Sequence, residues 1–341
     1  MSPLRWALIG PGRIAHRFAQ ALAAQPDGQL AWVHARDPAR GQAFAAQWAQ
    51  PGQVAPRVTT DLAALLAQPD VDAVYIASPH SAHGPAIEAC LTAGKPVLCE
   101  KPLVPTRAQA EPLVALARDR GVFLMEAVWT RFLPLYAHIA DWLRGQAIGE
   151  LRGMQSTFCF NVPFDAASRL YAPALAGGSL LDIGIYNLTV TQWVLQQAWG
   201  RCPEPSAVAA QGRLAATGVD QRVAGTLRFQ YGDRDVSSQF LCAFDSVADN
   251  AFTLVGERGH IRIQGFFHSS TQAVLQRAGE PPVVVNAPLA VNGFEGEIVE
   301  AMRCIRAGAV ESPTMPHADS LAVLGWMDRI RGQLGVHYPF E

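Results

Sequence analysis

Lysine is nearly absent from this sequence of 341 residues. Of its 27 basic residues only Lys95 and Lys101 are lysine, and all the others are arginine. Charged residues make up 16% of the chain, and the formal net charge is −2. A charge this small gives no electrostatic reason to expect nucleic acid or an acidic membrane as a partner. The scarcity of lysine raises the question of what arginine could not do at each of these two positions.

Long apolar runs and organised cysteines are also missing. No stretch reaches the roughly 18 apolar residues of a membrane span, and the first apolar run is too short for a signal peptide. The six cysteines form neither a C-x-x-C pair nor a cysteine–histidine spacing typical of metal sites. We therefore expect a cytoplasmic protein with reduced structural cysteines, no disulfide framework and no bound metal.

Apolar residues are plentiful, because they make up half of the chain. With this length they predict two domains, 1–125 and 126–341, since the sequence pattern changes at about residue 125. In the first domain short apolar runs alternate with helical periodicity, which predicts a Rossmann-type, doubly wound parallel sheet of the α/β class. The expected strands are 6–10, 30–35, 73–77, 97–99 and 122–125, and the expected helices are 14–24, 42–48, 62–66, 84–93 and 109–118.

The second domain is predicted to be of the α+β class, with a large, mostly antiparallel open sheet. Turn signals separate a series of strand-like segments between 207 and 285. The expected strands are 151–161, 223–231, 236–243, 251–255, 260–263 and 273–276. The expected helices are 133–143, 180–195, 295–307 and 318–334.

A glycine motif follows the first expected strand and opens the first expected helix. It has the form G-x-G-x-x-A and contains Gly10, Gly12, Arg13, Ile14 and Ala15. Gly10 permits a tight turn, Gly12 lets the backbone approach a pyrophosphate, and Ala15 lets the helix pack closely on the strand. The N–H groups at the helix N-terminus then face the phosphates. We expect a dinucleotide cofactor here; the alternative is an ordinary tight turn between a strand and a helix.

The end of the second expected strand distinguishes the two nicotinamide cofactors. An acidic residue there binds the ribose 2′-hydroxyl of NAD, whereas an arginine accommodates the 2′-phosphate of NADP. Here Arg36 comes first and Arg40 follows one turn later, with Arg13 in the glycine loop. A guanidinium can bind a phosphate through two hydrogen bonds. NADP is therefore favoured over NAD, although these arginines could be ordinary surface residues and Asp37 could still serve the ribose.

Lys101 lies at the carboxyl end of a central expected strand, directly after Glu100. Ligands bind at this edge of open α/β sheets. A lysine can change its protonation state when its surroundings lower its pKa, and an arginine effectively cannot. Lys101 is therefore a candidate for proton transfer; the alternative is that it pairs with Glu100 or a carbonyl. Lys95 lies in a Gly-Lys-Pro turn and is expected to face solvent.

Together these motifs resemble the family of glucose–fructose oxidoreductase, inositol dehydrogenase and MocA. The resemblance rests on the glycine loop, the segment S-P-H-S-A-H at 78–83 and the E-K-P triplet at 100–102. Segments 125–132, 177–186 and 338–341 resemble the branch that contains dimeric dihydrodiol dehydrogenase and NADP-dependent D-xylose dehydrogenase. The resemblance implies that Lys101 acts in proton transfer and that the open sheet forms a homodimer or higher homo-oligomer. It also implies that further residues contact the cofactor, namely Ser78, Pro79, His80, His83, Glu100 and Lys101.

Asp182 and Tyr186 are four residues apart in an expected helix, which places them on one face. Much of the family has histidine at the second position, so the tyrosine agrees with the dihydrodiol dehydrogenase branch. Tyr186 is the expected acid and base, because a neighbouring ammonium lowers the pKa of a phenol. The alternatives are that Tyr186 is a core residue and that Ser179 and Asp182 form a capping box. His83 is expected to support its loop.

Four further residues are candidates for contact with substrate. Arg131 could anchor substrate hydroxyls or a cofactor phosphate, or could form a surface salt bridge. Three aromatic residues could line the substrate pocket or belong to the core, namely Trp129, Phe158 and Phe160.

The predicted function is hydride transfer between NAD(P) and a carbinol or carbonyl carbon of a sugar, polyol or trans-dihydrodiol. The cofactor supplies the difficult chemistry, and the protein supplies position and electrostatics. One alternative is an oxidoreductase that keeps NADP bound while it cycles between two sugars. Another is a nucleotide-sensing regulator without catalysis, which need not keep Lys101 and Tyr186.

Overall fold

The computed structural model describes residues 2–50, 52 and 54–341. The chain forms two compact units. The first contains the chain up to Phe132 together with Ala290–Leu321, and the second contains Leu133–Leu289 together with Ala322–Glu341. The domains 1–125 and 126–341, divided where the sequence pattern changes, stay a prediction. By packing, however, the segment 290–321 belongs with the first unit, although it follows the second sheet in the sequence.

The first unit contains a six-stranded sheet in the order β3-β2-β1-β4-β5-β6, with all neighbouring strands parallel. Strands β4 to β6 are buried throughout, as expected for a sheet covered on both faces. The strand order reverses between β1 and β4, which creates the switch point where such folds bind ligands. The predicted Rossmann-type sheet is confirmed. Its strands are β1 (Leu4–Ile9), β2 (Gly28–His34), β3 (Arg57–Thr59), β4 (Ala73–Ile76), β5 (Val97–Glu100) and β6 (Leu124–Ala127).

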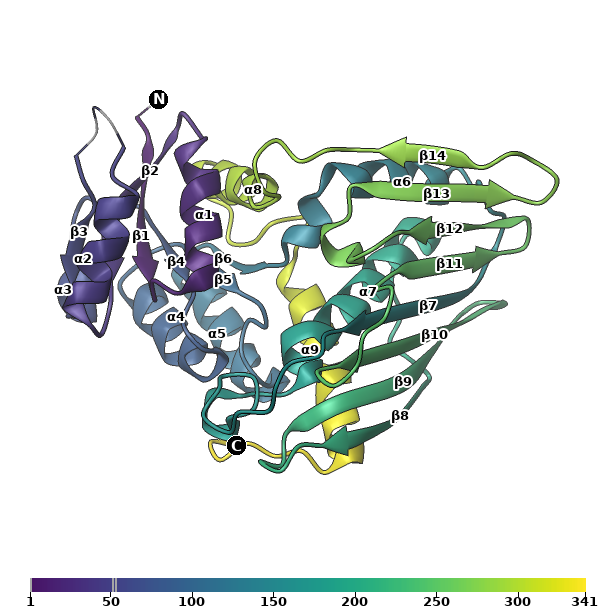
Figure 1. Ribbon diagram of the computed structural model, residues 1–341. Coiled ribbons are helices and arrows are strands. Elements are labelled where there is room, and N and C mark those ends of the chain that lie inside the picture. Colours follow the sequence, from purple (N-terminus) through teal and green to yellow (C-terminus); the bar gives the residue numbers. More distant parts are fainter. Residues whose placement is uncertain (1, 51, 53) are drawn as a thin grey trace. The chain divides into compact units, whose positions relative to one another are not determined.

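Helices of the first unit begin and end at residues that suit these positions. Asp37 caps α2 and Thr106 caps α5, which ends at Gly121 in the left-handed conformation. A helix from late in the sequence, α8, lies beside α1 (Figure 1). The helices are α1 (Arg13–Ala23), α2 (Pro38–Gln47), α3 (Leu62–Leu66), α4 (His83–Thr92), α5 (Arg107–Arg120) and α8 (Glu295–Arg306), with short 3₁₀ turns η1 (His80–Ala82) and η2 (Trp129–Phe132).

The second unit contains an eight-stranded sheet in the order β14-β13-β12-β11-β7-β10-β9-β8. Among the described strands of this sheet only β7 and β10 pair in parallel, and every other neighbouring pair is antiparallel. The predicted mostly antiparallel sheet is confirmed. Its strands are β7 (Leu151–Cys159), β8 (Ala207–Leu214), β9 (Asp220–Tyr231), β10 (Arg234–Ala243), β11 (Phe252–Gly256), β12 (Gly259–Ile263), β13 (Gln272–Arg277) and β14 (Val283–Asn286).

Helices α6 and α7 lie against one face of this sheet (Figure 1). Helix α7 is buried on every side from Ile185 to Leu195. The helix expected over 180–195 begins with a π-helical turn, η4, and continues as α7. The remaining helical segments are α6 (Pro134–Arg144), η3 (Pro173–Leu175), η4 (Leu180–Gly184), α7 (Ile185–Trp199), η5 (Phe267–Ser269) and α9 (His317–Leu334).

Candidate functional site

The glycine motif forms a tight turn at the carboxyl end of β1. Gly10 has a φ of +88°, and a Cβ atom there would lie 3.0 Å from the backbone nitrogen of Ser78. Position 10 therefore requires glycine both for its conformation and for the close approach of the neighbouring loop. Ala15 is fully buried beneath the turn, where a larger side chain would push α1 away from the sheet.

The N-terminus of α1 is suited to an anion. Gly12 is its N-cap, no side chain caps the helix, and its first turn contains no acidic residue. The N–H groups and the positive end of the helix dipole are thus available to a phosphate group. Arg13 is exposed in this first turn, and Ile14 is half-buried. These residues fit a dinucleotide pyrophosphate.

Two arginines lie beyond the end of β2. Arg36 and Arg40 are both exposed at the start of α2. Asp37 lies between them, and its Oδ1 accepts hydrogen bonds from the backbone nitrogens of Ala39 and Arg40 at 2.9 and 3.4 Å. Asp37 therefore has a structural role as the cap of α2. This edge of the sheet carries two exposed guanidinium groups, and their contact with a nucleotide stays a prediction.

His83 joins the loop after β4 to the loop after β5. It is fully buried, and its ring nitrogens lie 2.9 Å from the carbonyl oxygens of Pro102 and Ser78. Burial lowers the pKa of His83, which favours the neutral ring. This geometry fits the expected supporting role. The ring of His80 lies 5.9 Å from that of His83, and Pro79 precedes it in the same loop.

Glu100 ends β5 and is tied to its surroundings on both oxygens. Its Oε1 accepts a hydrogen bond from the Tyr75 hydroxyl at 2.5 Å, and its Oε2 accepts one from the Lys101 backbone nitrogen at 3.3 Å. Lys101 is half-buried and precedes Pro102 through a cis peptide bond. The lysine thus stands at the ligand-binding edge of the sheet, in the position that the sequence predicted.

Lys95 was wrongly expected to face solvent. Its ammonium group donates hydrogen bonds of 2.9 Å to the carbonyl oxygens of Gln68 and Val71, and the residue is half-buried. The flexible side chain of Lys95 lets its ammonium group reach the carbonyls of both Gln68 and Val71. The second lysine therefore has a structural role.

A buried carboxyl group near Glu100 was not recognised in the sequence. Glu297, in the first turn of α8, is fully buried, and neither of its oxygens has a hydrogen-bond partner among the described residues. Burial, reinforced by the charge of Glu100, raises the pKa of Glu297 well above its usual value. Glu297 is four residues before Ala301 and seven before Cys304, which places it on the buried face of α8. This spacing was the signal that could have revealed it.

Asp182 lies in the π-helical turn, and Tyr186 lies in the first turn of α7. The Oδ1 of Asp182 accepts a hydrogen bond from Arg169 Nη1 at 3.0 Å. The Ser179 hydroxyl instead donates to Asp220 at 2.8 Å, and no side chain caps η4 from Ser179. Ser179 therefore does not form the cap that the capping-box alternative requires, because its hydroxyl binds Asp220.

Aromatic side chains surround Tyr186 within the second unit. Phe158 and His268 lie with ring centroids 5.8 and 4.8 Å from that of Tyr186. Phe158 is 1% exposed and belongs to the core, whereas Phe160 is half-buried and stacks on the exposed Phe266 at 5.9 Å. Phe160 thus fits a pocket-lining role better than Phe158. The sequence analysis missed His268, which lies in the short 3₁₀ turn η5 with no motif around it.

Trp129 and Arg131 are both buried in the first unit. Trp129 packs against Phe294 at 5.0 Å, and the guanidinium of Arg17 lies 4.8 Å from its ring. Arg131 Nη1 lies 2.5 Å from Asp319 Oδ2, and the Arg131 side chain is 2% exposed. The salt bridge expected on the surface is therefore a buried one. A contact of either residue with substrate stays a prediction.

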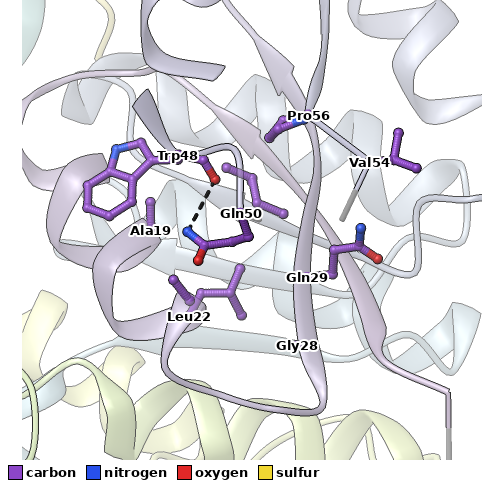
Figure 2. A pocket seen from close by; sticks show the side chains of 10 residues that line it. Ala19, Leu22, Gly28, Gln29, Trp48, Gln50, Val54 and Pro56 are labelled. Atoms are coloured by element: carbon purple, nitrogen blue, oxygen red, sulfur yellow. Dashed lines mark hydrogen bonds between the residues drawn. The ribbon is translucent and has the colours of Figure 1, made fainter. Parts of the chain in front are cut away.

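A hollow in the first unit is lined by other residues (Figure 2). Its lining includes Gly28 and Gln29, at the amino end of β2, and Trp48. The glycine turn and Lys101 stand at the carboxyl ends of the strands, so this hollow is a different feature. Among the residues described here, no group of three or more histidine, cysteine or acidic side chains could hold a metal, and none of the helices is long and apolar enough to cross a membrane.

Similar sequences cover the whole chain. The sequence matches the Gfo/Idh/MocA oxidoreductase family with an NAD-binding Rossmann fold over residues 4–128, and that family's C-terminal domain over 136–262. The trans-1,2-dihydrobenzene-1,2-diol dehydrogenase of Mus musculus is 34% identical over 344 residues, which cover 98% of each chain. The enzyme of the same name from Xenopus laevis is also 34% identical, over 98% of this chain and 99% of the other.

Similar solved structures extend over the same length. An aldose–aldose oxidoreductase from Caulobacter crescentus, complexed with glycerol, has a TM-score of 0.84 at 27% identity and covers 98% of each chain. A 3-ketoreductase from Actinomadura kijaniata, in complex with NADP and TDP-benzene, has a TM-score of 0.83 at 27% identity. It covers 97% of this chain and 98% of the other.

Proposed function

Because the chain belongs to the Gfo/Idh/MocA family of oxidoreductases, we propose that it transfers a hydride between NADP and a carbinol or carbonyl carbon of a sugar or trans-dihydrodiol. The observation that carries this proposal is the glycine turn at Gly10, followed by an uncapped helix N-terminus. The substrate class is supported by the names of the relatives, which include dihydrodiol dehydrogenases and an aldose–aldose oxidoreductase.

The described residues fit a dinucleotide. The Gly10 turn leaves no room for a side chain, and the α1 N-terminus offers N–H groups to the pyrophosphate. Arg36 and Arg40 would bind a 2′-phosphate, which favours NADP over NAD. When bound, the nicotinamide accepts or donates the hydride. The loop from Ser78 to His83 and the Glu100–Lys101 pair would support the nicotinamide end.

Tyr186 and Lys101 are assigned to the same proton transfer. During oxidation Tyr186 takes the proton of the substrate hydroxyl, and during reduction it returns that proton. The ammonium group of Lys101 stabilises the deprotonated tyrosine. Asp182, held by Arg169, orients the substrate or the tyrosine. Phe160 and Phe266 would contact an apolar ring face of the substrate.

The experiment is NADPH formation at alkaline pH with a panel of sugars and a trans-dihydrodiol. Tyr186→Phe and Lys101→Met should each lower kcat by about 10²–10⁴-fold while the Kd for NADP stays within about twofold. Tyr231→Phe, on an exposed tyrosine of β9, is the matched control and should keep wild-type activity. No NADPH formation with any substrate of the panel, or variants as active as the wild type, would contradict the assignment of Tyr186 and Lys101.

A second outcome concerns the cycling alternative, which the aldose–aldose relative favours. An enzyme that keeps NADP bound through both half-reactions should purify with the nucleotide attached. Absorbance of the purified protein at the wavelength of the reduced nicotinamide, after addition of a sugar, would show this. Full activity only after NADP is added would favour the simple dehydrogenase.

We also propose a cytoplasmic homodimer formed through the eight-stranded sheet and acting in sugar metabolism. On β9, Ala224 and Arg228 are exposed on the face opposite the buried Val223 and Leu227, so we assign this outer face to the contact with a second copy. Light scattering of the purified chain tests the dimer, and an Ala224→Glu substitution on that face should shift a dimer towards monomer.

A further inference from the structure

The segment that leads into the π-helical turn is held by residues from distant parts of the second unit. Asp220, the first residue of β9, is fully buried. Its Oδ2 accepts hydrogen bonds from the Ser179 hydroxyl at 2.8 Å and from the Leu180 backbone nitrogen at 2.6 Å. The carboxylate thus satisfies the backbone at the start of η4, as a capping side chain does, although it comes from 40 residues further along the chain.

Gly178 lies against this carboxylate, where there is no space for a side chain. It has a φ of +123°, and a Cβ atom there would overlap Asp220 Oδ1. That oxygen has no hydrogen-bond partner among the described residues. The Gly178 nitrogen donates to the Leu170 carbonyl at 2.8 Å, and its own carbonyl accepts from the Asp182 nitrogen at 3.2 Å. Gly178 therefore packs against the carboxylate of Asp220 and accepts a hydrogen bond from the backbone of Asp182.

A residue near the end of the chain binds the backbone of Gly177, the residue before Gly178. The hydroxyl of Tyr338 donates a hydrogen bond of 2.7 Å to the Gly177 carbonyl, and Tyr338 is buried. Arg331 lies 4.9 Å from the Tyr338 ring and binds Glu341 at 2.6 Å. Segment 338–341 was noted in the sequence only for its resemblance to the family branch. In the structure its Tyr338 binds the backbone of the loop that precedes η4.

We propose that Asp220 is a positioning residue for the proton-transfer group, and that Tyr338 supports it. By fixing the backbone from Gly177 to Leu180, the two residues set where η4 begins, and so where Asp182 and Tyr186 project. π-helical turns occur often at functional sites, and this one is held by a charge rather than by a local cap. The inference rests on the proposed role of Tyr186 in proton transfer.

The groups that face Asp220 determine its titration. Burial raises the pKa of Asp220 to about 6, while the Leu180 nitrogen, the Ser179 hydroxyl and, at longer range, Arg331 act to lower it. Tyr338 and Cys242 face the same carboxylate, and their own pKa values are raised well above the usual range, mainly by burial. These two groups therefore stay neutral while Asp220 titrates. Below about pH 6 Asp220 takes up a proton and loses its charge-assisted bond to Leu180.

The test is the pH profile of kcat in the direction of reduction, between pH 5 and 7. The wild type should lose activity below about pH 6. Asp220→Asn keeps the shape and one acceptor, so it should fold, lower kcat about tenfold and abolish this acidic limb. Ser179→Ala removes one donor from Asp220 and should move the limb to higher pH, which a merely structural role would not do. Tyr338→Phe should lower kcat a few-fold without moving the limb.

Asp233→Asn, in the exposed turn between β9 and β10, is the matched control and should leave the profile unchanged. An Asp220→Asn profile identical to that of the wild type, alongside an inactive Tyr186→Phe, would overturn the positioning role while the proposed function stood. Hydrogen exchange of the backbone at 178–186 gives a readout that needs no substrate. Faster exchange confined to this segment in Asp220→Asn supports the proposal even if no substrate is turned over, and unchanged exchange overturns it.

Discussion

The hydroxyl of Tyr75 donates a hydrogen bond of 2.5 Å to Glu100, the residue before Lys101. Tyr75 is fully buried, and Phe18 stacks on its ring at 3.8 Å. Burial, followed by the charge of Glu100, raises the pKa of Tyr75 well above its usual value, so the hydroxyl remains a donor. This short hydrogen bond from β4 therefore fixes the end of β5, directly before Lys101, the residue to which we assign a role in proton transfer.

We expect Tyr75→Phe to destabilise the protein by about 1–3 kcal/mol, because a buried carboxylate loses one of its hydrogen-bond donors. Urea unfolding followed by circular dichroism measures this change. Tyr231→Phe removes a hydroxyl from a tyrosine that is 41% exposed, and its effect should stay within about 0.5 kcal/mol. Equal losses in both variants would show that the buried hydrogen bond is not special.

Gly10→Ala should abolish binding of NADP. The added Cβ atom would lie 3.0 Å from the Ser78 nitrogen, and the φ of +88° disfavours any side chain. We expect the Kd for NADP, measured by fluorescence quenching, to rise at least about 100-fold. Gly94→Ala is the control, because Gly94 also has a positive φ of +70° but a Cβ atom there meets nothing within 4 Å. Equal Kd values for the two variants would show that the turn at Gly10 does not form part of the NADP site.

Arg36→Ala and Arg40→Ala should each weaken NADP and leave NAD almost unaffected. Loss of a charge-assisted hydrogen bond to a 2′-phosphate costs about 1.5–3 kcal/mol, or roughly 10–150-fold in Kd. Calorimetric titration with the two nucleotides gives the ratio directly. Arg107→Ala, which removes an exposed arginine paired with Glu111, should change neither Kd. A parallel loss of NAD and NADP affinity would mean that the arginines do not recognise the 2′-phosphate.

The strands that the sequence did not predict all lie at sheet edges. β3 is the outer strand of the first sheet, and β8 and β14 are the outer strands of the second. Edge strands have one unpaired side and little buried surface, so their hydrophobic alternation is weak. In β8 most residues are exposed, and in β14 three of four are exposed. The central strands are buried and periodic, which is why they could be predicted.

The candidate site divides in the same way. The glycine turn and Lys101 could be predicted because short local motifs at strand ends carry their chemistry. The partners of Ser179 and Asp182 could not, because Asp220 and Arg169 come from a strand start and an irregular loop. Spacing alone instead favoured a local capping box. Long-range polar contacts leave no periodic signal in a single sequence.

Glu297 should make the protein less stable as the pH rises. The unfolded carboxyl group loses its proton near its usual pKa of 4.5, whereas burial, reinforced by the charge of Glu100, keeps the folded one protonated to a much higher pH. Unfolding between these values releases a proton, so the free energy of unfolding falls by up to about 1.4 kcal/mol per pH unit. Glu297→Gln lacks this proton, and its stability relative to the wild type should therefore increase with pH above about 4.5.

Glu295, two residues earlier, is a control of opposite sign. Burial acts to raise the pKa of Glu295, but backbone N–H groups, including those of Val291 and Gly293, lower it below its usual value. Its contribution to stability is present above the unfolded pKa and is lost as the pH falls through the folded pKa. Glu295→Gln should thus be less stable than the wild type at pH 7 and approach it in acid. Urea unfolding of both variants from about pH 2.5 to 8 should separate them: the Glu295→Gln difference changes only below about pH 4.5, whereas the Glu297→Gln difference changes above it. A flat Glu297→Gln curve would show that Glu297 is ionised in the folded protein.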